Sequence, residues 1–249
     1  MPRLLTPLSF VLIGFLSAIY LPALLPSFIV NVRLTPPPNT NITLSATDNM
    51  ADALFKLIRN RRSYYPLGKE IAVPKGRIEE IVKEAVLHTP SSFNSQSNRA
   101  VVLFGGEHDK FWDITTSVLK PLVPEEQWGQ SSGKMSMFKG AAGTVLFFED
   151  QAVVEGCQSS VPAYADKFPI WATQSDAMVQ FVVWTALEAE GLGANLQHYN
   201  PLVDEKVAAE WKTPANWKLN AQLVFGAKTS KAAEKVFKDV NENVKVYAS

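Results

Sequence analysis

The sequence contains very little cysteine and histidine. One cysteine, Cys157, and three scattered histidines, His88, His108 and His198, occur among 249 residues. A single cysteine forms no intrachain disulfide and supports no cysteine-based zinc site, and the histidines form no H-E-x-x-H pattern. We therefore predict no metal centre.

The chain also lacks an excess of charge and the common catalytic motifs. Lysine plus arginine and aspartate plus glutamate number 24 each, and this balance argues against broad nucleic-acid binding. No P-loop or glycine-rich dinucleotide fingerprint follows a predicted strand. Gly129–Gly133 fits G-x-S-x-G, but Pro124–Trp128 before it is not a strand, so a serine nucleophile elbow is not expected.

The N-terminal region has no charged side chain between residues 4 and 32. Pro22 and Pro26 restrict a continuous helix to Leu8–Leu21, which is typical of a signal-peptide core or a signal anchor. A polar, proline-rich run follows from Thr35 to Asn49. The predicted organisation is a hydrophobic targeting or anchor segment at 1–33, a flexible linker at 34–49 and a folded domain at 50–249.

Three interpretations of residues 1–49 stay open. The segment anchors the protein, is cleaved from it, or is absent from the working protein, because Met50 opens a helix and is itself a candidate start. Membrane association would run through residues 4–32. We expect a cytoplasmic catalytic domain, and two arginines in the first 58 residues disfavour a mitochondrial presequence.

The rest of the chain alternates irregularly between helical and strand patterns, which favours an α+β layer fold. Gln127–Gly140 is predicted to be irregular, and the loose, aromatic-rich segment around Pro162 is interpreted as a lid. Helices are predicted at Asp52–Arg62, Pro74–Thr89, Phe111–Leu119, Asp176–Glu190 and Pro201–Trp211. Strands are predicted at Ala100–Phe104, Thr144–Phe148, Ala194–Gln197 and Leu219–Phe225, with an edge strand at Val244–Tyr247 that reaches a neighbouring molecule.

Three polar clusters are candidates for a binding site. Arg59–Ser63 ends a helix, and its guanidinium groups and hydroxyl suit a phosphate, although basic residues also complement a helix C-terminus. Pro90–Arg99 concentrates serines and amides, which suits either a ligand or a solvated turn. Asn195–Pro201 follows the predicted buried helix, and a lone His198 there is more often a satisfied histidine than a catalytic one.

The order of these clusters carries a resemblance to a known family. Arg61-Arg62-Ser63, then Pro90-Ser91-Ser92-x-Asn94-x-Gln96, then a Gly-Leu-Gly turn into a strand near residue 195 resemble the FMN-dependent nitroreductase-like superfamily. The resemblance is strongest to its fungal and bacterial fatty-acid-repression-mutant subgroup and covers residues 50–249. It implies a three-layer α+β sandwich with a mostly antiparallel sheet, assembled as a homodimer with a domain-swapped C-terminal strand and FMN at the interface.

The resemblance also assigns roles to individual positions. This chain departs from better known bacterial members at Tyr65, because those members have a lysine there, near the flavin N1. Lys134 or Lys139 would then take the role of that lysine. The implied FMN contacts are Arg61, Arg62, Ser63, Lys228 and Lys231 for the phosphate and ribityl chain, Ser91, Ser92, Asn94 and Gln96 for the ring and ribityl edge, partly from the other subunit, and the backbone of His198, Tyr199 and Asn200 near N5.

The implied function is an FMN-dependent NAD(P)H oxidoreductase. It would reduce nitroaromatic, quinone or similar electrophilic small molecules by ping-pong hydride transfer, in an oxidative-stress response, without a catalytic side chain, since FMN carries the chemistry. The alternative is a flavin- or lipid-responsive regulatory binding protein with little turnover. Tyr65 and the hydrophobic N-terminus motivate that alternative.

Overall fold

The computed structural model describes residues 50–248. The expected N-terminal segment at 1–33 and the linker at 34–49 lie outside the described residues. Within the described part of the chain, no helix is both long enough and apolar enough to cross a membrane.

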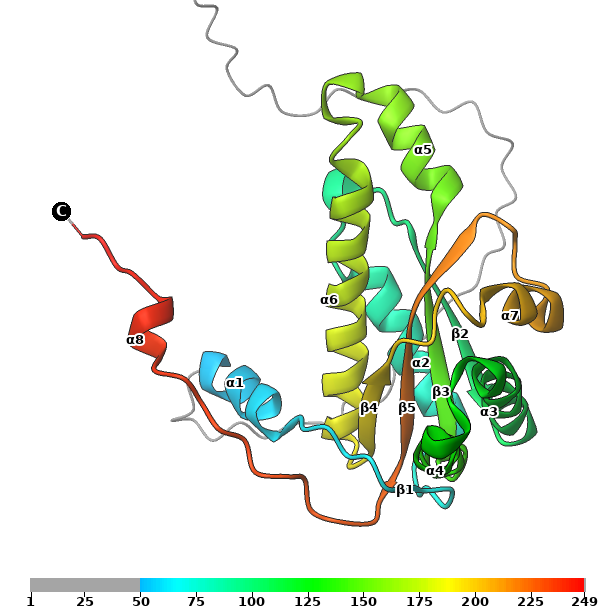
Figure 1. The fold of residues 1–249 in the computed structure, drawn as a ribbon. Coiled ribbons are helices and arrows are strands. Elements are labelled where there is room, and N and C mark those ends of the chain that lie inside the picture. The colour runs from blue at the N-terminus through cyan, green and yellow to red at the C-terminus, as the bar shows by residue number, and fades with distance from the viewer. Residues whose placement is uncertain (1–49, 249) are drawn as a thin grey trace, which may run out of the picture. The chain divides into compact units, whose positions relative to one another are not determined.

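Helices and short 3-10 turns surround one sheet (Figure 1). The helices are α1 (Met50–Asn60), α2 (Lys75–His88), α3 (Gly106–Leu119), α4 (Glu125–Lys139), α5 (Gln151–Ser160), α6 (Phe168–Ala189), α7 (Asp204–Trp211) and α8 (Val240–Asn243). The strands are β1 (Leu67–Gly68), β2 (Asn98–Phe104), β3 (Gly143–Asp150), β4 (Gly193–Gln197) and β5 (Trp217–Lys228). The 3-10 turns are η1 (Ser92–Asn94), η2 (Lys120–Leu122) and η3 (Pro162–Tyr164).

The sheet is antiparallel in every strand pair described. β3 lies between β2 and β5, and the other side of β5 pairs with β1 and with β4. Every residue of β3 is buried. Its side chains alternate, so Val145 and Phe147 enter one core while Leu146 and Phe148 enter the other. Both faces of the sheet are therefore covered, and the uninterrupted apolar run at Thr144–Phe148 follows from that.

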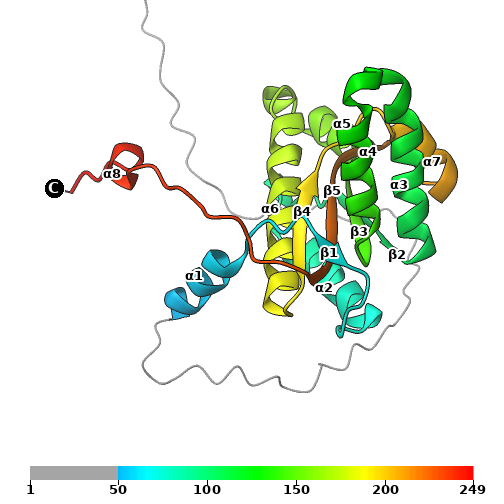
Figure 2. The ribbon, with the colours of Figure 1, turned by 60° about the horizontal axis from the view of Figure 1, so that its bottom comes forward.

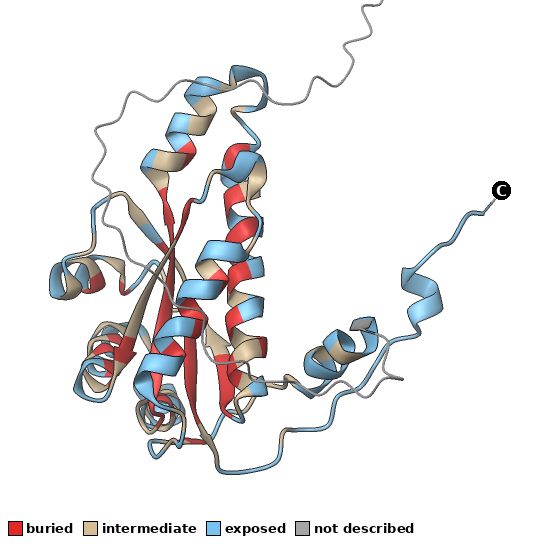
Figure 3. Cartoon of the chain, turned by 180° about the vertical axis from the view of Figure 1, so that it is seen from behind, coloured by how far each residue is buried: buried red, intermediate tan, exposed pale blue. Residues whose placement is uncertain are grey.

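Two helical layers complete the sandwich (Figure 2). α2 and α6 cover the face with Val145, and α3, α4 and α7 cover the opposite face. Figure 3 shows the buried residues concentrated in the sheet and on the helix sides that face it. The predicted three-layer α+β sandwich with an antiparallel sheet is confirmed, as are the four predicted strands, which are β2 to β5, and the predicted helices, although α3 begins five residues and α6 eight residues before the predicted start.

The segment Gln127–Gly140 was predicted to be irregular, and this was wrong. It lies almost entirely in α4, where only Met135 and Phe138 are buried. Gly129 and Gly133 lower helix propensity and the apolar pattern is sparse, so packing against α3 stabilises a helix that local preferences do not favour. The G-x-S-x-G match lies inside this helix, so it forms no nucleophile elbow.

The predicted loose segment between β3 and α6 is also mostly helical. Asp150 caps α5 by accepting a hydrogen bond from the Ala152 N–H at 3.1 Å. α6 begins at Phe168, eight residues before the predicted start, because Pro169 stands in its first turn, where a proline costs no hydrogen bond. The segment is therefore not loose, and its interpretation as a lid stays a prediction.

The predicted edge strand at Val244–Tyr247 does not pair with the sheet of its own chain. These residues follow α8 in an exposed tail that leaves the sandwich after β5 (Figure 1). Pairing with a neighbouring molecule stays a prediction.

A buried carboxyl group lies on α6. Asp176 is 1% exposed, and its Oδ2 accepts hydrogen bonds from Gln180 Nε2 at 2.7 Å and Asn220 Nδ2 at 3.1 Å, while Oδ1 has no partner. Burial, reinforced by the nearby charge of Glu149, raises the pKa of Asp176 to about 6. Ionisation of Asp176 therefore destabilises the folded state. The destabilisation is complete above pH 6 and vanishes at a pH well below the ordinary pKa of aspartate.

We predict that Asp176→Asn raises the free energy of unfolding at pH 8 by about 1–3 kcal/mol, since the amide keeps the shape without the charge. The gain should shrink toward zero as the pH falls to 4. Urea unfolding at the two pH values measures this, with Glu234→Gln in the exposed tail as control. An equal gain at both pH values, or a loss at pH 8, contradicts the pKa shift.

Candidate functional site

Basic side chains gather where α1, the start of β4 and the end of β5 meet. Ser63 forms a parallel bridge with Ala194 of β4, which places the end of α1 beside the sheet. Arg62 donates through Nη2 to the carbonyl of Ala233, in the chain that follows β5. Lys228 is the last residue of β5. The sheet thus brings together basic residues that are more than 160 positions apart in sequence.

α6 contacts two residues of this basic cluster. The Arg61 guanidinium lies 4.6 Å above the ring of Trp184, and Lys228 Nζ lies 2.6 Å from Glu188 Oε1, one helical turn further along α6. Lys231 is exposed beyond the end of β5. Glu188 and Trp184 are functional candidates that the sequence analysis missed, because their apolar sequence pattern predicts only a buried helix.

Two buried donors in the basic cluster have no acceptor. They are Arg61 Nε and Trp184 Nε1. A buried donor without a partner costs about 1–3 kcal/mol, so such atoms in native proteins usually have a ligand or solvent partner. Unpaired donors beside several cations are the arrangement that an anion such as a phosphate satisfies.

β4 leads from the basic cluster to the segment His198–Asn200. Asn195 Nδ2 donates to the carbonyl of Tyr64 at 2.7 Å, and Asn195 Oδ1 accepts from Gln197 Nε2 at 2.8 Å. These two bonds link the segment after α1 to the side chains of β4. A ligand that starts at the basic cluster and lies along β4 would therefore reach His198–Asn200.

Gln222 fixes the backbone of that segment. It is fully buried in β5, and its Oε1 accepts the N–H of Tyr199 at 2.7 Å, while its Nε2 donates to Asn200 Oδ1 at 3.2 Å. The Tyr199 N–H is therefore already used, which leaves the N–H groups of His198 and Asn200 as the available donors. The Tyr199 ring packs edge-on against Trp112 at 5.7 Å, and burial raises the pKa of its hydroxyl. A glutamine within the predicted strand Leu219–Phe225 is the sequence signal that could have indicated this role.

The serine-rich stretch folds into a compact, strained turn. Ser91 Oγ accepts the N–H of Gln96 at 2.9 Å, and the Ser91 carbonyl accepts the N–H of Asn94 at 2.9 Å. Phe93, Asn94 and Gln96 have φ values of 57°, 52° and 51°. Left-handed backbone at three non-glycine residues costs about 1–2 kcal/mol each, and such strain concentrates at functional sites.

Aromatic rings support this turn at the N-terminal end of α6. Phe93 is exposed, yet its ring lies 5.4 Å from Phe168, 6.1 Å from Trp171 and 6.4 Å from Tyr164, measured between centroids. The ring of Phe93 is nearly parallel to that of Trp171, at 27°. The four rings form a cluster in which Phe93 and Tyr164 are exposed and Phe168 is buried, and the sequence analysis recognised the segment only as aromatic-rich.

The serine-rich turn and the basic cluster lie at opposite ends of α6 (Figure 1). Phe93 contacts Trp171, and Arg61 contacts Trp184. At a rise of 1.5 Å per residue these two tryptophans are about 20 Å apart along the helix. Within one chain, therefore, the structure does not bring the Ser91–Gln96 group beside Arg61.

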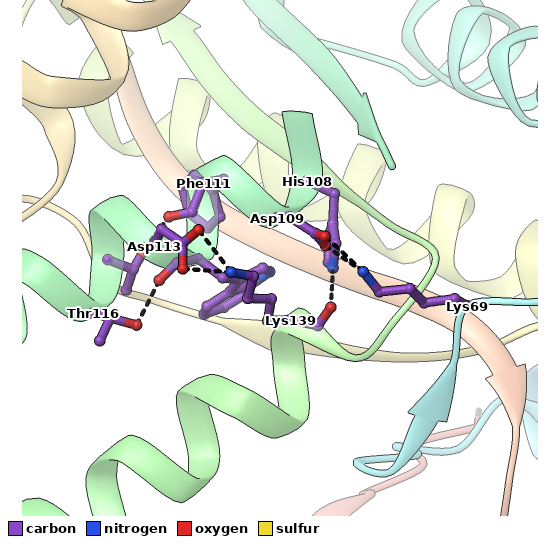
Figure 4. Close-up of polar contacts among 9 residues, drawn as sticks. Lys69, His108, Asp109, Phe111, Asp113, Thr116 and Lys139 are labelled. Carbon is purple, nitrogen blue, oxygen red and sulfur yellow. Dashed lines mark hydrogen bonds and ion pairs between the residues drawn. The ribbon is translucent and has the colours of Figure 1, made fainter. Parts of the chain in front are cut away.

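The two lysines considered as substitutes for Tyr65 lie elsewhere. Lys139 Nζ is paired with Asp113 Oδ1 at 2.6 Å on the α3–α4 side of the sheet, as Figure 4 shows, and Lys134 belongs to the same α4 layer. Tyr65 itself is exposed, near the basic cluster. Lys139 is therefore engaged in an ion pair with α3, on the sheet face opposite α6.

His108, also drawn in Figure 4, is a structural histidine. Its Nδ1 lies 2.9 Å from Thr144 Oγ1 and its Nε2 lies 3.3 Å from the Lys139 carbonyl. Burial lowers the pKa of His108 to about 4, so the ring is neutral at pH 7. In the described part of the chain, no group of three or more histidine, cysteine, aspartate and glutamate side chains is arranged to hold a metal ion.

Comparison with known proteins gives concordant matches. The model of the nitroreductase family matches residues 58–227. The nitroreductase FRM2 of Saccharomyces cerevisiae is 38% identical over 208 residues, which cover 82% of this chain and 100% of that protein. The structure of nitroreductase CinD from Lactococcus lactis in complex with nicotinic acid is 45% identical, with a TM-score of 0.74, and covers 78% of this chain and 100% of CinD. A putative nitroreductase from Desulfovibrio desulfuricans in complex with FMN shares the fold at 18% identity, with a TM-score of 0.59, over 82% of this chain and 100% of that one.

The strained turn yields a prediction about stability. Gln96→Gly should raise the free energy of unfolding by about 0.5–1 kcal/mol, because glycine adopts a φ of 51° without steric cost and the N–H that bonds Ser91 remains. Gln96→Val should lower it by more than about 1 kcal/mol, because a β-branched residue tolerates this φ least. Denaturant unfolding of the two variants gives opposite signs if the turn is strained; equal effects would contradict the left-handed geometry.

Proposed function

Since this chain belongs to the nitroreductase family, as its sequence predicts, we propose that it is an FMN-dependent oxidoreductase. It takes electrons from NAD(P)H and passes them to a nitroaromatic, a quinone or a similar electrophile, in an oxidative-stress response. The observation that carries the proposal is the basic cluster with its two unpaired buried donors, Arg61 Nε and Trp184 Nε1. A cofactor phosphate supplies the acceptors that these donors lack.

The residues present fit FMN along β4. Arg61, Arg62 and Lys228 would hold the phosphate, with Ser63 and Lys231 beside them. Residues of β4 would hold the ribityl chain, and His198 and Asn200 would present backbone N–H groups to the ring. When bound, FMN supplies the hydride chemistry, so the chain needs to bind and orient rather than to exchange protons.

The electron donor and the acceptor would use one pocket in turn. A nicotinic-acid complex has been solved for the relative CinD, and a nicotinamide ring is the reacting part of NAD(P)H. No dinucleotide-binding βαβ unit occurs among residues 50–248, where every strand pair is antiparallel. NAD(P)H and the electron acceptor would bind to the same flavin face one after the other, so no separate dinucleotide-binding unit would be needed.

A homodimer completes the site in this proposal. Trp171 and Trp184 are about 20 Å apart along α6, so Ser91, Ser92, Asn94 and Gln96 lie far from the basic cluster of their own chain. A groove of about 770 Å³ runs between α2 and α6, and exposed Met178, Phe181 and Val182 line it. Apolar surface of this kind is typical of a partner interface.

The tail favours the same assembly. Phe237, Val244 and Tyr247 are exposed in their own chain, on a segment long enough to reach a second molecule. A second copy that packs on α6 places its serine-rich turn near the first copy's flavin, and its C-terminal segment pairs there as the domain-swapped strand.

The central test is the visible spectrum of the purified full chain with added FMN. We expect flavin bands that persist through gel filtration and NAD(P)H-dependent reduction of a quinone. Arg61→Ala combined with Arg62→Ala should weaken FMN binding by about 100-fold or more, since each charge-assisted bond contributes about 1.5–3 kcal/mol.

Arg59→Ala is the matched control, because Arg59 is an exposed arginine in the last turn of α1. It should leave FMN affinity unchanged. Failure of the wild-type chain to bind FMN refutes the proposal, and FMN binding without NAD(P)H oxidation above the free-flavin rate favours the regulatory binding protein instead.

The dimer makes a separate prediction. Phe181→Glu places a charge on the exposed face of α6, so the protein should become monomeric and lose FMN, since the partner's turn no longer covers the ring. Light scattering coupled to gel filtration measures the mass. Leu122→Glu, at an even more exposed apolar residue in η2, should remain dimeric; a dimeric Phe181→Glu variant would exclude this interface.

A further inference from the structure

Glu188 is a nearly buried carboxylate at an unfavourable place in its helix. Its side chain is 8% exposed, and it stands in the last turn of α6, where the helix dipole disfavours negative charge. Its Oε1 lies 2.6 Å from Lys228 Nζ, but its Oε2 is buried without a hydrogen-bond partner. Local helix energetics therefore do not account for an acidic residue here.

Stability does not account for it either. This partly buried ion pair gains Coulomb energy but loses part of the hydration of both groups, so its net contribution to stability is small. The unpaired Oε2 adds a cost. What the pair provides is a defined position for Lys228.

A second contact restricts Lys228 further. Its Nζ lies 5.0 Å from the centroid of the Tyr64 ring. Tyr64 is itself held by β4, since its N–H donates to the Ala194 carbonyl at 3.0 Å and its carbonyl accepts from Asn195 Nδ2 at 2.7 Å. The ammonium group is thus confined between a carboxylate and a fixed aromatic face.

We propose that Glu188 is a positioning residue for recognition of the FMN phosphate, and this rests on the function proposed above. Glu188 does not touch the phosphate; it holds Lys228 so that its remaining N–H donors face the same anion as Arg61. Trp184, one turn earlier on α6, supports Arg61 in the corresponding way. The last two turns of α6 therefore set the geometry of two cations that come from α1 and β5.

The direction in which one substitution changes the affinity for FMN distinguishes this positioning role from a purely electrostatic effect. Glu188→Gln removes a negative charge next to an anion site, so Coulomb's law alone predicts tighter binding of FMN. A positioning role predicts weaker binding, because Lys228 is then free to move into solvent and loses its orientation.

The experiment compares FMN with riboflavin, which has the same ring and ribityl chain but no phosphate. Fluorescence titration of the full wild-type chain should give a clear preference for FMN. Glu188→Gln should weaken FMN binding by about 10-fold and leave riboflavin binding unchanged. Lys228→Met should do the same, and the double variant should be no weaker than Lys228→Met alone, because the two residues act through one contact.

Glu190→Gln is the matched control, since Glu190 caps the same helix but pairs with Arg77 at 2.8 Å. It should leave both affinities unchanged. Unchanged or tighter FMN binding by Glu188→Gln overturns the inference, as does an equal loss of riboflavin, which would mean that the fold itself is damaged. A wild-type chain without preference for FMN over riboflavin refutes the phosphate site and, with it, the proposed function.

Discussion

The burial of one face of α6 against the sheet is the contact on which the candidate site depends. Val179, Val183 and Leu187 pack into the core beneath β3 and β5, so the helix cannot shift without opening that core. Its other residues are then held in place as a rigid support. Trp171 supports the serine-rich turn at one end, and Trp184 and Glu188 support the basic cluster at the other.

This arrangement explains why polar and strained features are tolerated at both ends of one helix. Left-handed residues in the turn and unpaired donors beside Arg61 each cost free energy. The buried sheet offsets those costs, since both of its faces are covered. The separation of the two ends also links cofactor binding to assembly in our proposal: residues that one chain keeps about 20 Å apart are brought together by a second copy.

Much of the fold could be predicted from residue patterns. The stripe Ile78, Ile81, Val82, Ala85 identified α2, and the apolar run at Thr144–Phe148 identified β3, because burial imposes those periods directly on sequence. α4 escaped prediction, since Met135 and Phe138 alone face the core and two glycines weaken the local signal. α5 and the first eight residues of α6 were not predicted, because Gly156 and Pro169 are typical of loops, whereas here Pro169 occupies a first turn.

By itself the sequence determined the alternation of elements, the family and the groups that carry the candidate chemistry: the arginines after α1, the serines and amides before β2, and the lysines at and after the end of β5. These follow from residue type and order, which are local properties. Only the tertiary structure decided which of them meet. The pairing of β4 with β5 brings Arg61 and Lys228 to the same end of α6, and the length of that helix keeps Ser91–Gln96 apart from them. Glu188, Trp184 and Gln222 gained their roles in the same way, because a buried side chain acts through neighbours that are distant in sequence.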